Sequence, residues 1–279
     1  MHHGDRRDQA VDPSSKPEFV LAVWSRKRHR AEIQSLREKR SPFTPIAARG
    51  VDHINLPIAS YIVSVLYLVR HGQASFGTDD YDRLSDRGHE QSRALGKALA
   101  QLEVTPSRII SGGMLRQKQT AQGASEAANW GLDLQIDQGW DEFNATDIIN
   151  AYPEQDPRAK TDTRIFQRML EKASTRWSSG EHDEDYLESF ATFTSRVEQA
   201  LKDAVNGLGS GESAVVVSSS GAIAWTAAHL LNGGFEQWLP INRVTVNSAV
   251  SKIVSGAQGT TLVSFNDHGH LPTPWITYR

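Results

Sequence analysis

The sequence contains no cysteine among its 279 residues, and this absence excludes several kinds of chemistry. A disulfide scaffold, a thiolate metal site and a cysteine nucleophile all require cysteine. Long hydrophobic runs are also missing, because the longest strongly apolar stretch, residues 61–69, is too short to span a bilayer as a helix. The start of the chain does not combine a basic region with an apolar core, as a signal peptide does. We therefore expect a soluble, cytoplasmic protein with no membrane span.

A large excess of one charge is missing as well. The formal net charge is −3, from 30 basic and 33 acidic residues, so the composition gives no reason to expect nucleic-acid binding. The charge is unevenly distributed, because residues 1–60 hold 11 basic and 7 acidic residues. Five prolines interrupt this segment, in which only residues 19–39 could form a helix. We expect residues 1–60 to be a largely disordered basic extension, with a nucleic-acid or membrane-surface partner as the alternative.

Residues 61–279 alternate between strand and helix patterns, which favours a single α/β domain. The run at 61–69 is apolar on both faces, as expected of a central strand in a parallel sheet. The expected strands are 61–69, 109–110, 132–136, 214–217, 244–254 and 260–265, and the expected helices include one from Ser85 and those at 114–129, 190–208 and 222–231. This order predicts a three-layer α/β/α sandwich around a mostly parallel sheet. The helical segment 144–190 would cover the site, and 244–254 could offer an edge strand for a homodimer.

Polar residues follow the carboxyl ends of several predicted strands. In open α/β sheets, ligands bind beyond these ends. Arg70 and His71 follow the first strand, Arg116 follows the second after two glycines, and Glu142 follows the third. Arginine suits phosphate oxygens, histidine can act as base, metal ligand or nucleophile, and a carboxylic acid can donate a proton to a leaving oxygen. Taken one at a time, these residues could equally be a capped histidine, a surface arginine and an exposed loop carboxylate.

Together the motifs resemble the histidine phosphatase (phosphoglycerate mutase-like) superfamily. Four segments carry the resemblance: LYLVRHGQ at 66–73, LSDRGHEQ at 84–91, SGGMLRQKQTA at 111–121 and WDEF at 140–143. Their order and spacing make the match specific, and it extends over essentially all of the predicted domain. The resemblance implies a phosphoglycerate mutase-like fold.

The resemblance also implies a two-step transfer of a phosphoryl group without a metal ion or another cofactor. His71 would attack phosphorus and become phosphohistidine, with its other ring nitrogen held by a backbone carbonyl near Gly72. Arg70 and Arg116 would hold the phosphoryl oxygens. Glu142 would protonate the leaving alcohol and then activate the hydrolytic water.

One departure from the family pattern lies in the phosphate pocket. The family usually places a second pocket histidine after a late buried strand, but here residues 218–223 read SSSGAI, with Ser219 at the histidine position. Near the end of the chain, residues 265–271 read FNDHGHL, which resembles a branch of the family that combines these two features. We expect Ser219 and His268 to bind phosphate, with His268 supplying the missing cation. A capped loop histidine and half of a metal-binding pair are the alternatives for His268.

The leading interpretation is a phosphomonoester hydrolase that acts on a small phosphorylated substrate or a phosphoprotein. A degenerate phosphate-binding or phosphoprotein-binding module with little turnover is the main alternative, because Ser219 carries no charge. A phosphoglycerate mutase-type phosphotransferase is a weaker alternative, since residues 73–81 do not match the distinctive block of the mutases. A pure binder needs neither a nucleophile nor an acid, so the presence of both His71 and Glu142 favours an enzyme.

Overall fold

The computed structural model describes residues 63–75 and 82–278. They belong to one compact unit, Pro57–Arg279. The predicted basic extension, with its possible helix at 19–39, lies outside the described residues.

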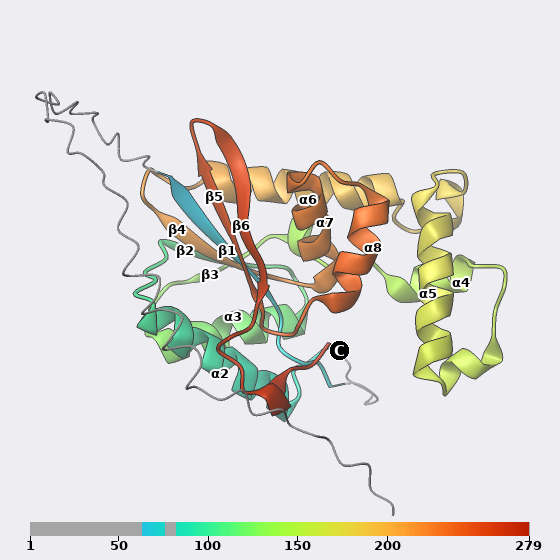
Figure 1. Ribbon diagram of the computed structural model, residues 1–279, viewed down its shortest axis with the longest axis horizontal. Coiled ribbons are helices and arrows are strands. Elements are labelled where there is room, and N and C mark those ends of the chain that lie inside the picture. The colour runs from blue at the N-terminus through green and yellow to red at the C-terminus, as the bar shows by residue number, and fades with distance from the viewer. Residues whose placement is uncertain (1–62, 76–81, 279) are drawn as a thin grey trace, which may run out of the picture. The chain divides into compact units, whose positions relative to one another are not determined.

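A six-stranded sheet forms the centre of this unit, in the order β3-β2-β4-β1-β5-β6 (Figure 1). The strands are β1 (Ser64–Arg70), β2 (Arg108–Ser111), β3 (Leu134–Ile136), β4 (Ser213–Ser218), β5 (Val250–Gly256) and β6 (Gly259–Asp267). The first four strands in chain order run parallel to one another, whereas β5 is antiparallel to both β1 and β6. The predicted mostly parallel sheet is therefore confirmed.

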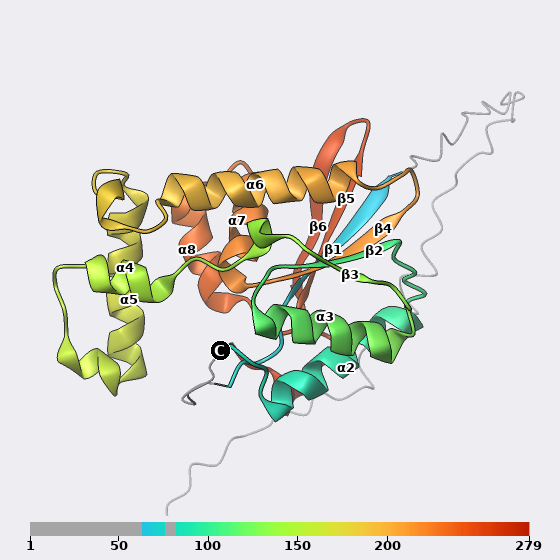
Figure 2. The ribbon, with the colours of Figure 1, turned by 180° about the vertical axis from the view of Figure 1, so that it is seen from behind.

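Helices cover both faces of the sheet, as Figures 1 and 2 show. On one face lie α2 (Asp86–Gln101) and α3 (Leu115–Ala128), and on the other lie α6 (Phe190–Asn206) and α7 (Ser220–Leu230), with α8 (Phe235–Val244) beside α7. Two further helices, α4 (Ala145–Ala151) and α5 (Thr163–Ser178), form a separate cap next to this layer. The predicted α/β/α sandwich with a helical insertion is confirmed.

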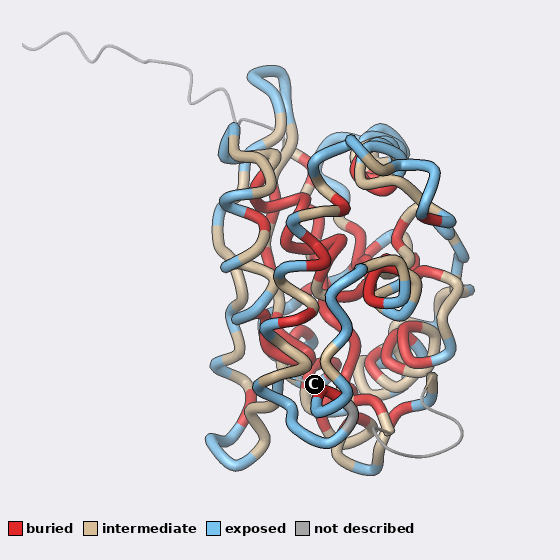
Figure 3. Tube along the Cα trace, turned by 90° about the vertical axis from the view of Figure 1, so that its right-hand side faces the viewer, coloured by how far each residue is buried: buried red, intermediate tan, exposed pale blue. Residues whose placement is uncertain are grey.

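The two cores follow from the alternation of side chains along the strands. Leu66 and Leu68 of β1 pack into the larger core with α6 and α7, whereas Val69 packs into the smaller core with α2 and α3. Residues i and i+2 of a strand share a face, so a central strand must be apolar on both faces to serve both cores. The buried residues accordingly lie along the middle of the trace in Figure 3. No helix within the described residues combines the length and the apolarity needed to cross a membrane.

The strand predicted over 244–254 is wrong in its first half. Residues up to Val244 belong to α8, which the sequence analysis did not predict, and β5 begins only at Val250. The β-branched residues around Thr245 are typical of a strand, but the intervening loop turns back through Ser248, which has a φ of 61°. Because β5 pairs with strands on both sides, it cannot be the edge strand that was expected for a homodimer. Among the described strands, β3 and β6 lie at the edges.

Candidate active site

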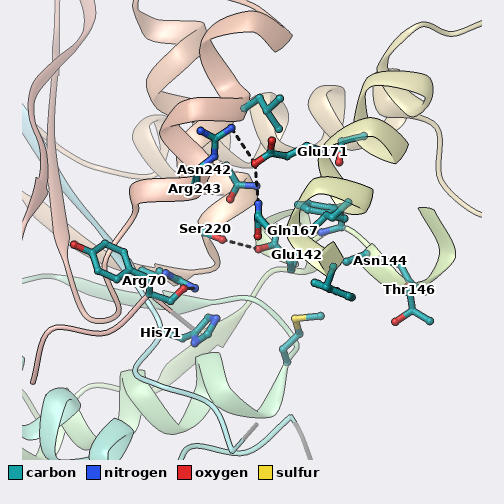
Figure 4. Close-up of a pocket in the computed structure, with 18 of the residues that line it drawn as sticks. Arg70, His71, Glu142, Asn144, Thr146, Gln167, Glu171, Ser220, Asn242 and Arg243 are labelled. Atoms are coloured by element: carbon teal, nitrogen blue, oxygen red, sulfur yellow. Dashed lines mark hydrogen bonds and ion pairs between the residues drawn. The ribbon is translucent and has the colours of Figure 1, made fainter. Parts of the chain in front are cut away.

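A cavity of about 640 Å³ opens where β1 ends, between the sheet and the α4–α5 cap. Arg70 and His71 line its inner end, together with Arg116 from the first turn of α3. Glu142 lines the side nearest α7, and residues of α5 and α8 form the outer end (Figure 4). The structure therefore brings together the four residues that the sequence analysis placed after three different strands. Parallel strands end at the same edge of a sheet, which explains this convergence.

His71 is held in one orientation by hydrogen bonds on both ring nitrogens. Its Nδ1 lies 2.7 Å from the carbonyl oxygen of Gly72, and its Nε2 lies 3.2 Å from Nε of Arg116. Burial holds the pKa of His71 well below its usual range, and the positive charges of Arg116 and Arg70 lower it further. The imidazole is therefore neutral. Since a carbonyl oxygen can only accept, the proton is on Nδ1, and the unprotonated Nε2 accepts the hydrogen bond from Nε–H of Arg116 at the inner end of the cavity.

The two arginines at the inner end are anchored by different parts of the chain. Arg70 donates to the carbonyl oxygen of Thr245 and, over 3.0 Å, to that of Tyr278. Arg116 forms an ion pair of 2.6 Å with Asp82, which the sequence analysis did not identify. Both guanidinium groups are largely buried, and each brings a permanent positive charge to the inner end of the cavity. The inner end is suited to a phosphate dianion.

Glu142 is fixed by the start of α7 and by the aromatic core. Its Oε2 accepts from the backbone N–H of Gly221 at 3.0 Å and from the Ser220 hydroxyl at 3.3 Å. A Cβ atom at position 221 would lie 2.2 Å from Oε1 of Glu142, so this close approach requires glycine. The neighbouring Phe143 packs against Trp177 and two further aromatic rings. The carboxylate is held at the cavity wall and cannot easily turn away.

Ser219 lies behind the cavity wall and is fully buried. Its hydroxyl accepts a 2.9 Å hydrogen bond from the side-chain amide of Gln117. The same amide group donates to the carbonyl oxygen of Trp140 over 3.1 Å, and the Ser218 hydroxyl donates to that oxygen over 2.7 Å. The serine turn therefore supports the segment that carries Glu142.

His268 is not among the residues that line the cavity. Its Nδ1 lies 2.6 Å from the carbonyl oxygen of Asn266, as in a capped loop histidine. The structure thus brings together Arg70, His71, Arg116 and Glu142 but places neither Ser219 nor His268 with them. Among the described residues no three His, Asp or Glu side chains are grouped so that they could hold a metal ion.

A set of polar residues that was not expected from the sequence ties the His71 loop to the C-terminal tail. The side-chain amide of Asn247 donates to the backbone oxygen of His71 over 3.1 Å. Gln91 accepts from the backbone of Gln73 and donates to Thr277 in the tail. Asn247 and Gln91 are completely buried. An Asn-Ser pair within a β-branched run is a turn signal, and it could have identified the loop around Asn247.

The pKa of His71 predicts how stability depends on pH. In the unfolded chain the imidazole titrates near 6.5, whereas the folded protein holds it neutral to lower pH. Below about pH 6.5 the unfolded state therefore binds a proton that the folded state does not, and stability is lost as the pH falls further. The free energy of unfolding should fall by up to about 1.4 kcal/mol per pH unit from this group. Above that pH its contribution is constant.

Urea unfolding between pH 7 and pH 5 tests this prediction. Wild type should lose stability more steeply than His71→Gln, which has no imidazole at this position. Burial also lowers the pKa of His270, but that residue is present in both proteins and cancels in the comparison. Parallel curves for the two proteins would contradict the inference that His71 is buried in its neutral form.

Comparison with known proteins identifies a matching family and a shared fold. The model of the histidine phosphatase superfamily (branch 1) matches residues 66–268. A phosphoglycerate mutase structure from Bacillus anthracis aligns with a TM-score of 0.54 at 18% identity, covering 75% of this chain and 95% of the mutase. A phosphoserine phosphatase mutant from Entamoeba histolytica, in complex with phosphoserine, gives a TM-score of 0.54 at 18% identity. The alignment covers 75% of this chain and 100% of the phosphatase. A mycobacterial glucosyl-3-phosphoglycerate phosphatase gives a TM-score of 0.52 at 19% identity, covering 74% of this chain and 100% of the phosphatase. At such identities these structures show a shared fold. A sequence comparison with curated proteins gave no match.

Proposed function

Since the chain belongs to the histidine phosphatase superfamily, whose members include phosphatases and mutases, we propose that it is a phosphomonoester hydrolase that acts through a phosphohistidine on His71. One observation carries this proposal. His71 lines the cavity as a buried, neutral imidazole, with Nδ1 hydrogen-bonded to the carbonyl oxygen of Gly72 and with Nε2 unprotonated, where it accepts from Nε–H of Arg116. A histidine nucleophile requires this tautomer.

In the first step, Nε2 of His71 attacks the phosphorus of the bound ester. The bond between phosphorus and the alcohol oxygen breaks, and the carboxyl group of Glu142 gives its proton to that oxygen. The positive charge that arises on the imidazole is stabilised by the Gly72 carbonyl oxygen, which accepts from Nδ1–H. Alcohol leaves, and the phosphoryl group remains on His71.

In the second step, a water molecule attacks the same phosphorus atom. Glu142, now a carboxylate, takes a proton from the water, and the phosphorus–nitrogen bond breaks with its electron pair returning to Nε2. Arg70 and Arg116 stabilise the charge on the phosphoryl oxygens in both steps. Inorganic phosphate is released and both residues return to their starting states.

The support of Glu142 favours an enzyme over a phosphate-binding module. The backbone of Gly221, the Ser220 hydroxyl and the packing of Phe143 together fix a carboxylate beside an anion-binding pocket. A negative charge at that position would weaken the binding of a phosphate dianion, so a module that only binds phosphate gains nothing from it. A proton donor and acceptor for phosphoryl transfer has to be there.

The proposal predicts hydrolysis of a generic aryl phosphate in buffer that contains a metal chelator. Phenol and inorganic phosphate should be released in equal amounts, and an added alcohol such as glycerol should not change that ratio. The arginines supply the electrostatic stabilisation, so the chelator should change the rate by less than about twofold. Phosphate binding without turnover would support the binding module, and phosphate recovered on the added alcohol would support a transferase.

A further inference from the structure

The cavity continues well beyond the place where a phosphate group would sit. Its outer end lies between α5 and α8, opposite His71 (Figure 4). One face of α5 supplies an apolar row and a polar row to this end, because residues three or four positions apart share a helix face. The residues at the outer end are Phe166, Gln167, Leu170 and Glu171 of α5 and Leu239, Asn242 and Arg243 of α8. These side chains would contact the leaving group of an ester whose phosphate lies against Arg70 and Arg116.

The charges at the outer end compensate one another. Glu171 forms an ion pair of 2.9 Å with Arg243, and its Oε1 atom also accepts a 3.2 Å hydrogen bond from Gln167. Among the described lining residues outside the phosphate site, Glu171 and Arg243 balance each other, and Glu142 is neutral when the ester binds because it acts first as the acid. The cavity is therefore positive at the inner end and close to neutral at the outer end. An ester with a second anionic group would meet unfavourable electrostatics at the outer end.

The outer end has a hydrogen-bond acceptor that no described residue uses. Both partners of Glu171, Arg243 and Gln167, lie on Oε1, and its Oε2 atom has none among the described residues. The side-chain oxygen of Asn242 is buried and has no hydrogen-bond partner within the same part of the chain. Figure 4 places Asn242 beside Glu171 and Gln167. The Asn242 oxygen is closed off from the cavity, so Oε2 of Glu171 is the acceptor that a ligand with N–H or O–H groups would meet at this end.

Resting on the proposed function, we infer a substrate class from this arrangement. The substrate is a phosphomonoester whose leaving group has an apolar body and, at its far end, hydrogen-bond donors with no negative charge, preferably an ammonium group. The body would contact Phe166, Leu170 and Leu239, and the donors would bind Glu171. The ion pair with Arg243 holds Glu171 in place and leaves its second oxygen for the substrate.

Three phenyl phosphates that differ only in the 4-substituent test the inference: aminomethyl, hydroxymethyl and carboxyl. For wild type, kcat/KM should fall in that order. Glu171→Gln should reduce the ratio of aminomethyl to hydroxymethyl kcat/KM by about fivefold, the size expected for a partly exposed ion pair. Arg243→Gln should raise the ratio, because it leaves the carboxylate of Glu171 uncompensated. Because the aminomethyl-to-hydroxymethyl ratio is compared between wild type and variant, the intrinsic reactivity of each ester cancels.

Glu154→Gln is the matched control, since it removes the same charge from an exposed residue of the cap that does not line the cavity. It should leave the ratio within twofold of wild type. An unchanged ratio in both Glu171→Gln and Arg243→Gln, or a wild-type preference for the carboxyl ester, would overturn the inference while leaving the hydrolase intact. If wild type hydrolyses none of the three esters, or if His71→Ala is equally active, the proposed function itself fails and the inference with it.

Discussion

Replacing His71 by alanine is expected to reduce kcat/KM for an aryl phosphate by roughly 10⁴-fold or more. The variant lacks the atom that forms the bond to phosphorus, and no neighbouring group can take over the attack. The other groups at the inner end, Arg70 and Arg116, are guanidinium groups that stay protonated and have no free lone pair. Phosphate binding should be retained, because both arginines remain in place.

Two controls separate lost chemistry from lost folding. His229→Ala makes the same change near the end of α7, outside the cavity, and should keep kcat/KM within about twofold of wild type. His71→Gln retains a polar group at the buried position and should be as inactive as the alanine variant while unfolding cooperatively. Substantial turnover by a folded His71 variant would show that the reaction does not pass through this residue.

The second large effect is expected for Glu142→Gln. Glutamine fits the space of the carboxyl group but can neither donate a proton to the alcohol nor accept one from water. For an alkyl phosphate, whose leaving group needs protonation, kcat/KM should fall by about 10²–10⁴-fold. For 4-nitrophenyl phosphate the first step needs little protonation, so kcat/KM should change much less.

In the same variant, the second step, hydrolysis of the phosphohistidine, should become rate-limiting. With 4-nitrophenyl phosphate, Glu142→Gln should release a burst of nitrophenol close to one equivalent of enzyme and then turn over slowly, because no base activates the water. Glu126→Gln, an exposed carboxylate on α3, provides the control and should behave as wild type. Equal losses for the alkyl and aryl esters with no burst would mean that Glu142 acts only by shaping the site.

The inner end of the site could be predicted from the sequence because it depends on local patterns. A strand that is apolar on both faces has to be central, and the polar residues that follow it have to lie at its carboxyl end. Arg70 and His71 are placed in this way by β1, and Arg116 is placed by the glycine-rich start of α3. Topology then brings these residues together in space without any information on side-chain contacts.

The remaining features depend on contacts between distant parts of the chain. The first half of the strand predicted over 244–254 is wrong because this segment turns, and the buried Asn247 donates a hydrogen bond to the backbone oxygen of His71 instead of continuing a strand. Ser219 aligned with a pocket histidine, yet its hydroxyl meets Gln117 behind the wall. The pairing of Glu171 with Arg243 joins two helices whose register no sequence pattern specifies.

Trapping the covalent intermediate would show whether the phosphoryl group passes through His71. Wild type and Glu142→Gln would be mixed with 4-nitrophenyl phosphate, quenched in alkali within the first turnover and digested for peptide mass spectrometry. We expect one added phosphoryl group on the peptide that contains His71, stable in alkali and lost in acid, with greater occupancy in Glu142→Gln. Steady turnover with no phosphoryl group on His71, or with the group on another residue, would contradict it.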